Sequence, residues 1–231
     1  MTRLVCFGPD IWIAEGPIVS FLGFPYPTRM AVIRLKDDSL FVWSPIALDE
    51  PLRAEVDSLG KVAHLVSPNK IHHLFLGEWK RAYPAAQLYA SPGLRRRRRD
   101  LKFDAVLRDR LEPAWTDEIE QVKFRGSFAM TEIVFLHRAS RTAIFADLIE
   151  NFPPGWFKGW RGVLARLDGI VSPDYGAPRE WRATFWRRKA ARKALERILA
   201  FAPEKVVIAH GNMAREDGTV FVRTAFRWLL R

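Results

Sequence analysis

Short apolar runs of four to six residues, ended by turn-forming residues, restrict the fold of this chain more than any other feature. Runs of this length are typical of β-strands, whereas a helix needs an apolar pattern over about ten residues. The first ninety residues contain runs of this form at 4–7, 11–14, 30–35, 39–44, 62–66 and 86–90. The sequence Lys36-Asp37-Asp38 joins two of them and predicts a hairpin. The first third of the chain is therefore expected to be rich in β-structure.

Helical patterns alternate with these runs. After the run 62–66, apolar residues recur at helical spacing from Ile71 to Trp79, so a helix is expected before the strand 86–90. The other expected elements are a helix over 51–59, strands over 119–124, 131–137, 142–147 and 205–210, and helices near 159–169, 180–202 and 218–230. Their order is β-rich, β-α-β, β-rich and α-β-α, which indicates two mixed halves that face each other.

Composition excludes several classes of protein. The chain has 231 residues, of which 48% are hydrophobic, so it can bury a core and wholesale disorder is excluded. No uncharged apolar stretch approaches the roughly 18 residues of a transmembrane helix. Asp10 and Glu15 interrupt the N-terminal segment before a secretory signal could develop. The single cysteine, Cys6, cannot build a disulfide framework, so a soluble cytoplasmic protein is expected.

The net charge of +11 is confined to the later part of the chain. Residues 1–90 contain nine basic and nine acidic residues, whereas residues 91–231 contain 28 and 17. Two segments concentrate the positive charge, Arg95–Arg99 and Arg187–Arg197. Such segments attract polyanions without specifying which one. Two interpretations stay open: a solvated surface, or contact with phosphate groups or nucleic acid.

Imidazoles and a carboxylate stand at the ends of predicted strands. His72 and His73 follow a predicted buried strand and are expected to open the next helix, while Asp147 and His210 end two later strands. In α/β folds, functional sites collect at the carboxyl ends of strands. Neutral histidine together with aspartate is a suitable ligand set for zinc, iron or manganese. These four residues are therefore the first candidates for a metal site.

These positions resemble the signature of the metallo-β-lactamase superfamily, which contains metal-dependent hydrolases and oxidoreductases. The signature is a strand followed by T-H-x-H-x-D-H, a His after a later strand, an Asp that ends the following hairpin, and a His after a late strand. Here the segment Ser67–His73 takes the first part, and Ser127 takes the place of the next His. Asp147 matches the Asp that bridges two metals, and His210 matches the late His.

The resemblance extends from about residue 10 to residue 215 and implies an α/β (α+β) fold, a four-layer αββα sandwich. It also implies one domain over residues 1–231. A Trp-, Pro- and Gly-rich segment at about 152–178 matches nothing in the family and is expected to be an insertion. A basic C-terminal helical segment is expected at about 180–202.

A narrower resemblance is to one branch of this superfamily, known only as a domain of unknown function. Its members carry a P-T-R-M segment, here Pro27–Met30. They also carry the pattern S/A-P-N-x-x-H-H-L-x-L-G-E-W, here Ser67–Trp79. This resemblance implies the fold of the superfamily but no particular reaction.

Departures from the signature change the expected metal content. Pro68, Lys70 and Ser127 stand where the superfamily has the three His ligands of the first metal, so that metal is predicted to be absent. The resemblance leaves one mononuclear set, which is His72, His73, Asp147 and His210, with Asn69 as an additional or supporting group. Such a set could hold one divalent ion, Zn, Fe or Mn. The degenerate signature equally allows a site without metal.

Two functions follow from these alternatives. The first is a divergent mononuclear hydrolase that attacks an anionic ester, amide or phosphoester, with Asp147 and Lys70 as catalytic residues and Lys70 orienting the anionic group. The second is a metal-free binding protein in which Lys70 pairs with Asp147 and the pocket holds an anionic ligand or nucleic acid. The aromatic residues Trp156, Phe157 and Trp160 suggest a lid, a homo-oligomer contact or a membrane-interface contact.

Overall fold

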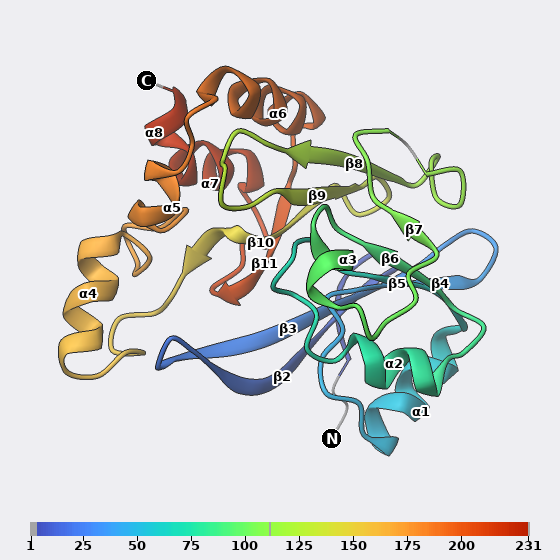
Figure 1. Ribbon diagram of the computed structural model, residues 1–231. Coiled ribbons are helices and arrows are strands. Elements are labelled where there is room, and N and C mark those ends of the chain that lie inside the picture. Colours follow the sequence, from blue (N-terminus) through green and yellow to red (C-terminus); the bar gives the residue numbers. More distant parts are fainter. Residues whose placement is uncertain (1–3, 111, 231) are drawn as a thin grey trace.

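Two β-sheets packed face to face form the centre of the molecule (Figure 1), in the computed structural model that describes residues 4–110 and 112–230. Within these residues the first sheet runs in chain order through β1 (Val5–Gly8), β2 (Ile11–Phe21), β3 (Phe24–Arg34), β4 (Ser39–Trp43), β5 (Lys61–Val66), β6 (Gln87–Ala90) and β7 (Ala105–Val106). Strands β1 to β4 pair antiparallel, and β4 to β7 pair parallel. The predicted hairpin lies between β3 and β4.

The second sheet has the order β11-β10-β9-β8. Its strands are β8 (Ile119–Phe124), β9 (Glu132–His137), β10 (Thr142–Asn151) and β11 (Lys205–Gly211). Strands β8, β9 and β10 form an antiparallel meander, and β11 joins β10 in parallel. A parallel pair needs a crossover connection, and the chain between β10 and β11 supplies it with helices.

Helices cover the outer face of each sheet and complete the four layers. Apolar side chains of both sheets fill the space between them, where the rings of Phe41 and Phe135 lie 5.3 Å apart. The first sheet is covered by α1 (Glu50–Leu59), α2 (Leu76–Ala82) and α3 (Leu94–Arg97), and the second by α6 (Arg188–Phe201), α7 (Gly218–Ala225) and α8 (Arg227–Leu230). This arrangement confirms the predicted αββα sandwich (Figure 1).

The segment predicted to be an insertion forms a separate small cluster beside the sheets. It contains α4 (Trp160–Asp168) and is followed by α5 (Arg179–Ala183). Figure 1 shows α4 next to the far end of the β2–β3 hairpin. Phe24 of that hairpin contacts Phe157 and Trp160, with ring centroids 5.5 and 5.6 Å apart. The hairpin and this segment therefore share one apolar cluster.

Three predicted helices differ from the structure, and one of them, expected over 218–230, is divided at Phe226 into α7 and α8. The helix expected to begin at His72 begins only at Leu76. The long helix expected over 180–202 is divided into α5 and α6. The division arises because the intervening backbone pairs with another loop: Thr184 O accepts the N–H of Phe128 at 3.2 Å, and Arg187 N–H donates to Gly126 O at 3.1 Å. The N–H of Arg187 is a single donor, so it does not donate to a helical acceptor at the same time.

Part of the arginine run Arg95–Arg99 is helical. Arg95–Arg97 belong to α3, where Arg95 donates to Phe103 O at 2.8 Å. Arg98 donates to Asp100 at 2.7 Å and to His73 O at 2.7 Å. The bond to His73 O connects the run to the loop before α2. Among the described residues, every helix is too short or too polar to span a lipid bilayer.

Candidate metal centre

A tight turn after β5 presents His72. Asn69 shapes this turn, because its Oδ1 accepts the backbone N–H groups of Ile71 and His72 at 3.0 and 3.2 Å. Ser67 Oγ closes the turn by donating to Asn69 O or His72 O, at 2.7 and 2.6 Å. Such side-chain bonds compete with helix formation, which explains why the helix starts later than the apolar spacing predicts.

A bulge in β10 presents Asp147. Phe145 pairs with Ile208 of β11, and Glu150 pairs with His210, so β10 contains more residues than its partner over this stretch. The bulge frees the backbone N–H groups of Ala146 and Asp147, and the buried Glu132 of β9 accepts them at 2.8 and 2.9 Å. Bulges of this kind redirect side chains next to functional sites.

The end of β11 presents His210. Its Nδ1 lies 2.7 Å from Pro27 O of β3. The buried guanidinium of Arg29, also on β3, donates to Ile208 O of β11 and forms an ion pair with Glu15 at 2.6 Å. The Pro27–Met30 segment thus connects the two sheets beside His210. The ring of Tyr26 stands edge-on to that of His210, with centroids 5.0 Å apart.

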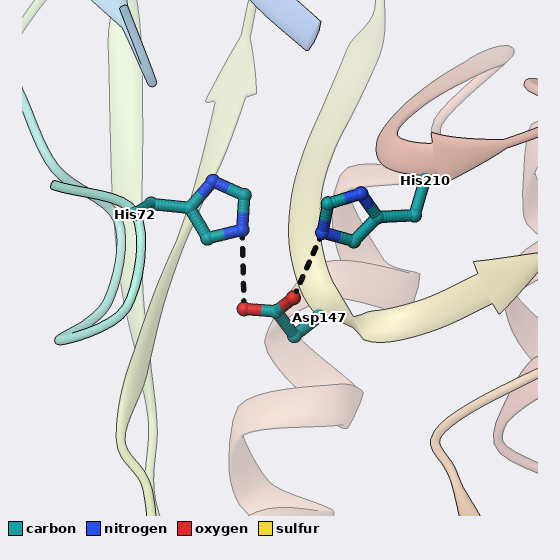
Figure 2. Close-up of side chains that lie close together, drawn as sticks. All are labelled: His72, Asp147 and His210. Carbon is teal, nitrogen blue, oxygen red and sulfur yellow. Dashed lines mark hydrogen bonds and ion pairs between the residues drawn. The ribbon is translucent and has the colours of Figure 1, made fainter. Parts of the chain in front are cut away.

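Figure 2 shows that these three elements bring His72, Asp147 and His210 together. His72 Nε2 lies 3.2 Å from Asp147 Oδ2, and His210 Nε2 lies 3.1 Å from Asp147 Oδ1. Their candidate ligand atoms all lie within 4.8 Å of one another. The side chains of all three are at most 10% exposed. Two imidazoles and one carboxylate on three different elements are a ligand set that zinc or iron accepts.

The ring orientations test whether this set fits a metal ion. A carbonyl oxygen can only accept, so His210 Nδ1 carries the hydrogen that Pro27 O receives. Ser44 Oγ lies 2.7 Å from Nδ1 of His72. Metal-binding histidines are oriented in this way by a partner on the second ring nitrogen. His210 Nε2 therefore faces Asp147 either as an N–H of an imidazolium or with a lone pair that requires a cation. His72 Nε2 faces Asp147 in these two forms or as the N–H of a neutral imidazole whose Nδ1 accepts from Ser44. The donor set fits one divalent ion.

Burial and neighbouring charges shift the pKa values of the groups in the cluster. Burial alone would raise the pKa of Asp147, but His72 and His210 outweigh it and hold that pKa well below its usual range. Burial opposes the protonation of His72, yet the adjacent carboxylate raises the pKa of His72 above its usual value. Burial and the charge of Asp147 raise the pKa of Glu132 to about 7. Asp147 is thus ionised at neutral pH, as a metal ligand has to be.

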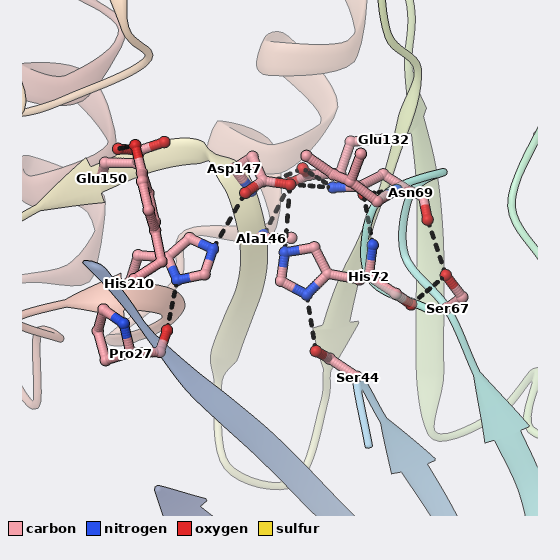
Figure 3. A network of polar contacts seen from close by, with 12 residues as sticks. Pro27, Ser44, Ser67, Asn69, His72, Glu132, Ala146, Asp147, Glu150 and His210 are labelled. Atoms are coloured by element: carbon pink, nitrogen blue, oxygen red, sulfur yellow. Dashed lines mark hydrogen bonds and ion pairs between the residues drawn. The ribbon is translucent and has the colours of Figure 1, made fainter. Parts of the chain in front are cut away.

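A network of polar contacts supports the cluster (Figure 3). Asn69 Nδ2 donates to Asp147 Oδ2 at 2.5 Å and to Glu132 Oε2 at 3.0 Å. Sequence reasoning did not identify Glu132 or Ser44. The signal for Glu132 was a carboxyl side chain directly before the apolar run 133–136. In the structure all six residues of β9 are buried. A buried carboxyl group needs partners that only the folded chain provides.

The remaining candidates from the sequence lie at other places. His73 lines the same cavity but turns to Arg98, with 3.3 Å between His73 Nδ1 and the guanidinium, and is not part of the cluster. Lys70 is half-buried and does not line the cavity, and among the described residues it forms no ion pair with Asp147. Asn69 faces Asp147 with its amide nitrogen, a donor, rather than with its oxygen. It therefore supports Asp147 rather than offering a ligand atom.

The cluster lies on the wall of a cavity of about 280 Å³. Residues of β2, the turn before α2 and the start of α5 form the other walls, among them Phe21, Phe75 and Trp181. Tyr26 Oη donates to the buried Glu150 at 3.2 Å. Burial and the charge of Asp147 raise the pKa of Glu150 well above its usual value. Arg97 is the one Lys or Arg among the described lining residues.

Comparison with known proteins agrees with this geometry. Residues 10–158 match the family described as "Domain of unknown function (DUF4336)". No curated protein matches the chain in sequence. Among solved structures, a metallo-β-lactamase from Pontibacter korlensis is 12% identical, with a TM-score of 0.62 over 100% of both chains.

Two further structures have the same fold. The mono-zinc form of the metallo-β-lactamase FIM-1 from Pseudomonas aeruginosa is 14% identical, with a TM-score of 0.60 over 99% of this chain and 96% of that one. The Flv1 flavodiiron core from Synechocystis sp. PCC6803 is 12% identical, with a TM-score of 0.64 over 99% of this chain and 60% of that one. The chain therefore has the metallo-β-lactamase fold.

Proposed function

This chain belongs to the DUF4336 family and has the metallo-β-lactamase fold, and we propose that it is a hydrolase that works with one divalent metal ion held by His72, Asp147 and His210. The observation that carries the proposal is the convergence of two oriented imidazoles on one ionised carboxylate at the wall of a cavity. A divalent ion held there would act as a Lewis acid on the scissile group of an ester, amide or phosphoester.

A single metal ion is favoured because Pro68, Lys70 and Ser127 occupy the positions that hold the His ligands of the first metal in the metallo-β-lactamase signature. Pro68 offers no side-chain ligand, and its carbonyl accepts the N–H of Ile133 at 2.8 Å. Ser127 Oγ lies 2.6 Å from Thr184 Oγ1. Lys70 would repel a nearby cation. Among the described residues, His72, Asp147 and His210 are therefore the one candidate ligand set at this place.

Several residues of the chain would hold the three metal-binding side chains in position. Asn69 and Glu132 fix the position of Asp147, while Ser44 and the Pro27 carbonyl orient the two imidazoles. Preorganisation of this kind keeps the site in place without reorganisation during the reaction. Arg97 rather than Lys70 is the basic side chain among the described residues that line the cavity.

Elemental analysis of the purified, untagged protein tests the proposal. We expect about one equivalent of Zn, Fe or Mn in the wild type and its loss in the His72→Ala, Asp147→Ala and His210→Ala variants. His73→Ala is the matched control, because this neighbouring histidine lies outside the cluster, and it should keep the metal. Circular dichroism of each variant verifies that it is folded.

Two outcomes would contradict the proposal. Two equivalents of metal would show that further ligands exist. No metal after reconstitution would refute the hydrolase and leave the metal-free binding protein. In that second case, binding of an anionic ligand or nucleic acid should persist in chelator and weaken steeply with salt.

A further inference from the structure

A second groove adjoins the cavity of the cluster. It measures about 390 Å³ and lies between the end of the β2–β3 hairpin and α4. Phe21, Tyr26 and Glu180 line both spaces, so the two lie side by side. All but two of the ten residues that line the groove are hydrophobic. A ligand at the cluster could therefore extend into an apolar channel.

Exposed hydrophobic side chains gather around this groove. On α4 they are Trp160, Val163, Leu164 and Leu167, a spacing that places them on one side of the helix. At the hairpin, Phe21 is 41% exposed and Leu22 is 85% exposed. Leu22, Leu164 and Leu167 line the groove. Contiguous apolar surface of this kind marks a binding site more often than isolated exposed residues do.

The polar residues of the groove indicate the charge of its occupant. They are Asp168 and Glu180, and among the described lining residues there is no Lys or Arg. Burial and a hydrogen bond with Asp168 raise the pKa of Glu180 to about 7. A carboxylate or phosphate on the occupant would meet these acidic groups, and Arg182, which lowers the pKa of Glu180, does not line the groove. An uncharged ligand with an alkyl chain avoids that cost.

We propose that this groove binds the alkyl or acyl chain of an uncharged amphiphile, an ester or amide whose reacting group lies at the His72–Asp147–His210 cluster. The position of the reacting group rests on the proposed function, whereas binding of the chain requires only the groove. The anionic substrates that the sequence suggested are disfavoured in this part of the site.

Binding of primary alcohols to chelator-treated protein tests the proposal without any need for activity. Calorimetry with 1-hexanol, 1-octanol and 1-decanol should give affinities that rise about fourfold for each added CH₂. Alkanoates of equal length should bind at least tenfold more weakly at pH 8, where Glu180 is ionised.

Two variants on α4 provide a matched pair. Leu167 and Val163 are both 60% exposed, but only Leu167 lines the groove. Leu167→Asp should weaken the binding of 1-decanol at least tenfold, and Val163→Asp should leave it unchanged. Leu22→Asp, at the hairpin, should act like Leu167→Asp. All three positions are exposed, so the variants are expected to fold.

Three results would overturn the inference: no dependence on chain length, equal effects of Leu167→Asp and Val163→Asp, or tighter binding of alkanoates than of alcohols. Equal effects would indicate unspecific adhesion to the apolar surface. The test separates this inference from the proposed function. Chain binding by a protein that takes up no metal on reconstitution would refute the hydrolase alone. A protein that takes up metal but whose affinity for alcohols does not depend on chain length would refute the groove alone.

Discussion

Replacement of Ser44 by alanine tests how the cluster is organised. Ser44 is 6% exposed, and its Oγ lies 2.7 Å from His72 Nδ1. The substitution removes one oxygen atom and leaves the backbone and the neighbouring side chains unchanged. Without this partner the His72 ring can rotate, and its Nε2 no longer faces Asp147 in a fixed position.

The expected magnitude follows from these contacts. Loss of one buried hydrogen bond should lower the free energy of unfolding of the metal-free protein by about 1 kcal/mol. Loss of the group that orients a metal-binding histidine should weaken metal affinity by about 10- to 100-fold. That range corresponds to about 1.4–2.7 kcal/mol. Metal affinity should therefore change more than stability.

The assay is a competition titration of zinc against a chelator of known affinity, with urea denaturation of the metal-free protein in parallel. Ser91→Ala is the matched control, because Ser91 is fully buried and its Oγ has no hydrogen-bond partner among the described residues. That variant should keep both stability and metal affinity. Equal zinc affinity of Ser44→Ala and the wild type, with loss of zinc in His72→Ala, would refute the orienting role of Ser44.

Three further predictions concern other parts of the structure. Gly211 has φ +94°, and a Cβ there would lie 2.1 Å from Asn151 O, so Gly211→Ala should lower the free energy of unfolding by about 3 kcal/mol or more in urea denaturation; wild-type stability would contradict this. Burial lowers the pKa of His137 to about 4, so the folded state resists its protonation. Stability should rise by up to about 3 kcal/mol between pH 4 and pH 6.5, and His137→Asn should lack that rise in denaturation curves measured across this range. Burial, Arg97 and Arg98 lower the pKa of His73 to about 4, so Arg98→Ala should raise it in an NMR titration, and an unchanged value would exclude a direct electrostatic effect.

Much of the architecture was predictable because local patterns determine it. The strand predicted over 119–124 has these bounds in the structure, and the hairpin at Lys36–Asp38 lies between β3 and β4. Alternation of short apolar runs with turn residues constrains the backbone over a few residues at a time. The resemblance to the metallo-β-lactamase superfamily also indicated the order of the layers, and the sandwich confirms it.

The identity of the residues in the cluster was only partly predictable. Sequence alone nominated His72, Asp147 and His210, since each follows or ends an apolar run. It could not separate His72 from His73, because their directions depend on the Asn69 turn rather than on a helix. In the structure His72 faces Asp147 and His73 faces Arg98.

The sequence by itself thus determined the strands, the turns and the candidate side chains, which depend on neighbours close along the chain. Only the tertiary structure decided which candidates meet. The bulge in β10 directs Asp147, and its freed N–H groups require the acceptor that Glu132 provides. Pro27, more than 180 residues before His210, orients that imidazole. These contacts depend on register between distant strands, which no local pattern encodes.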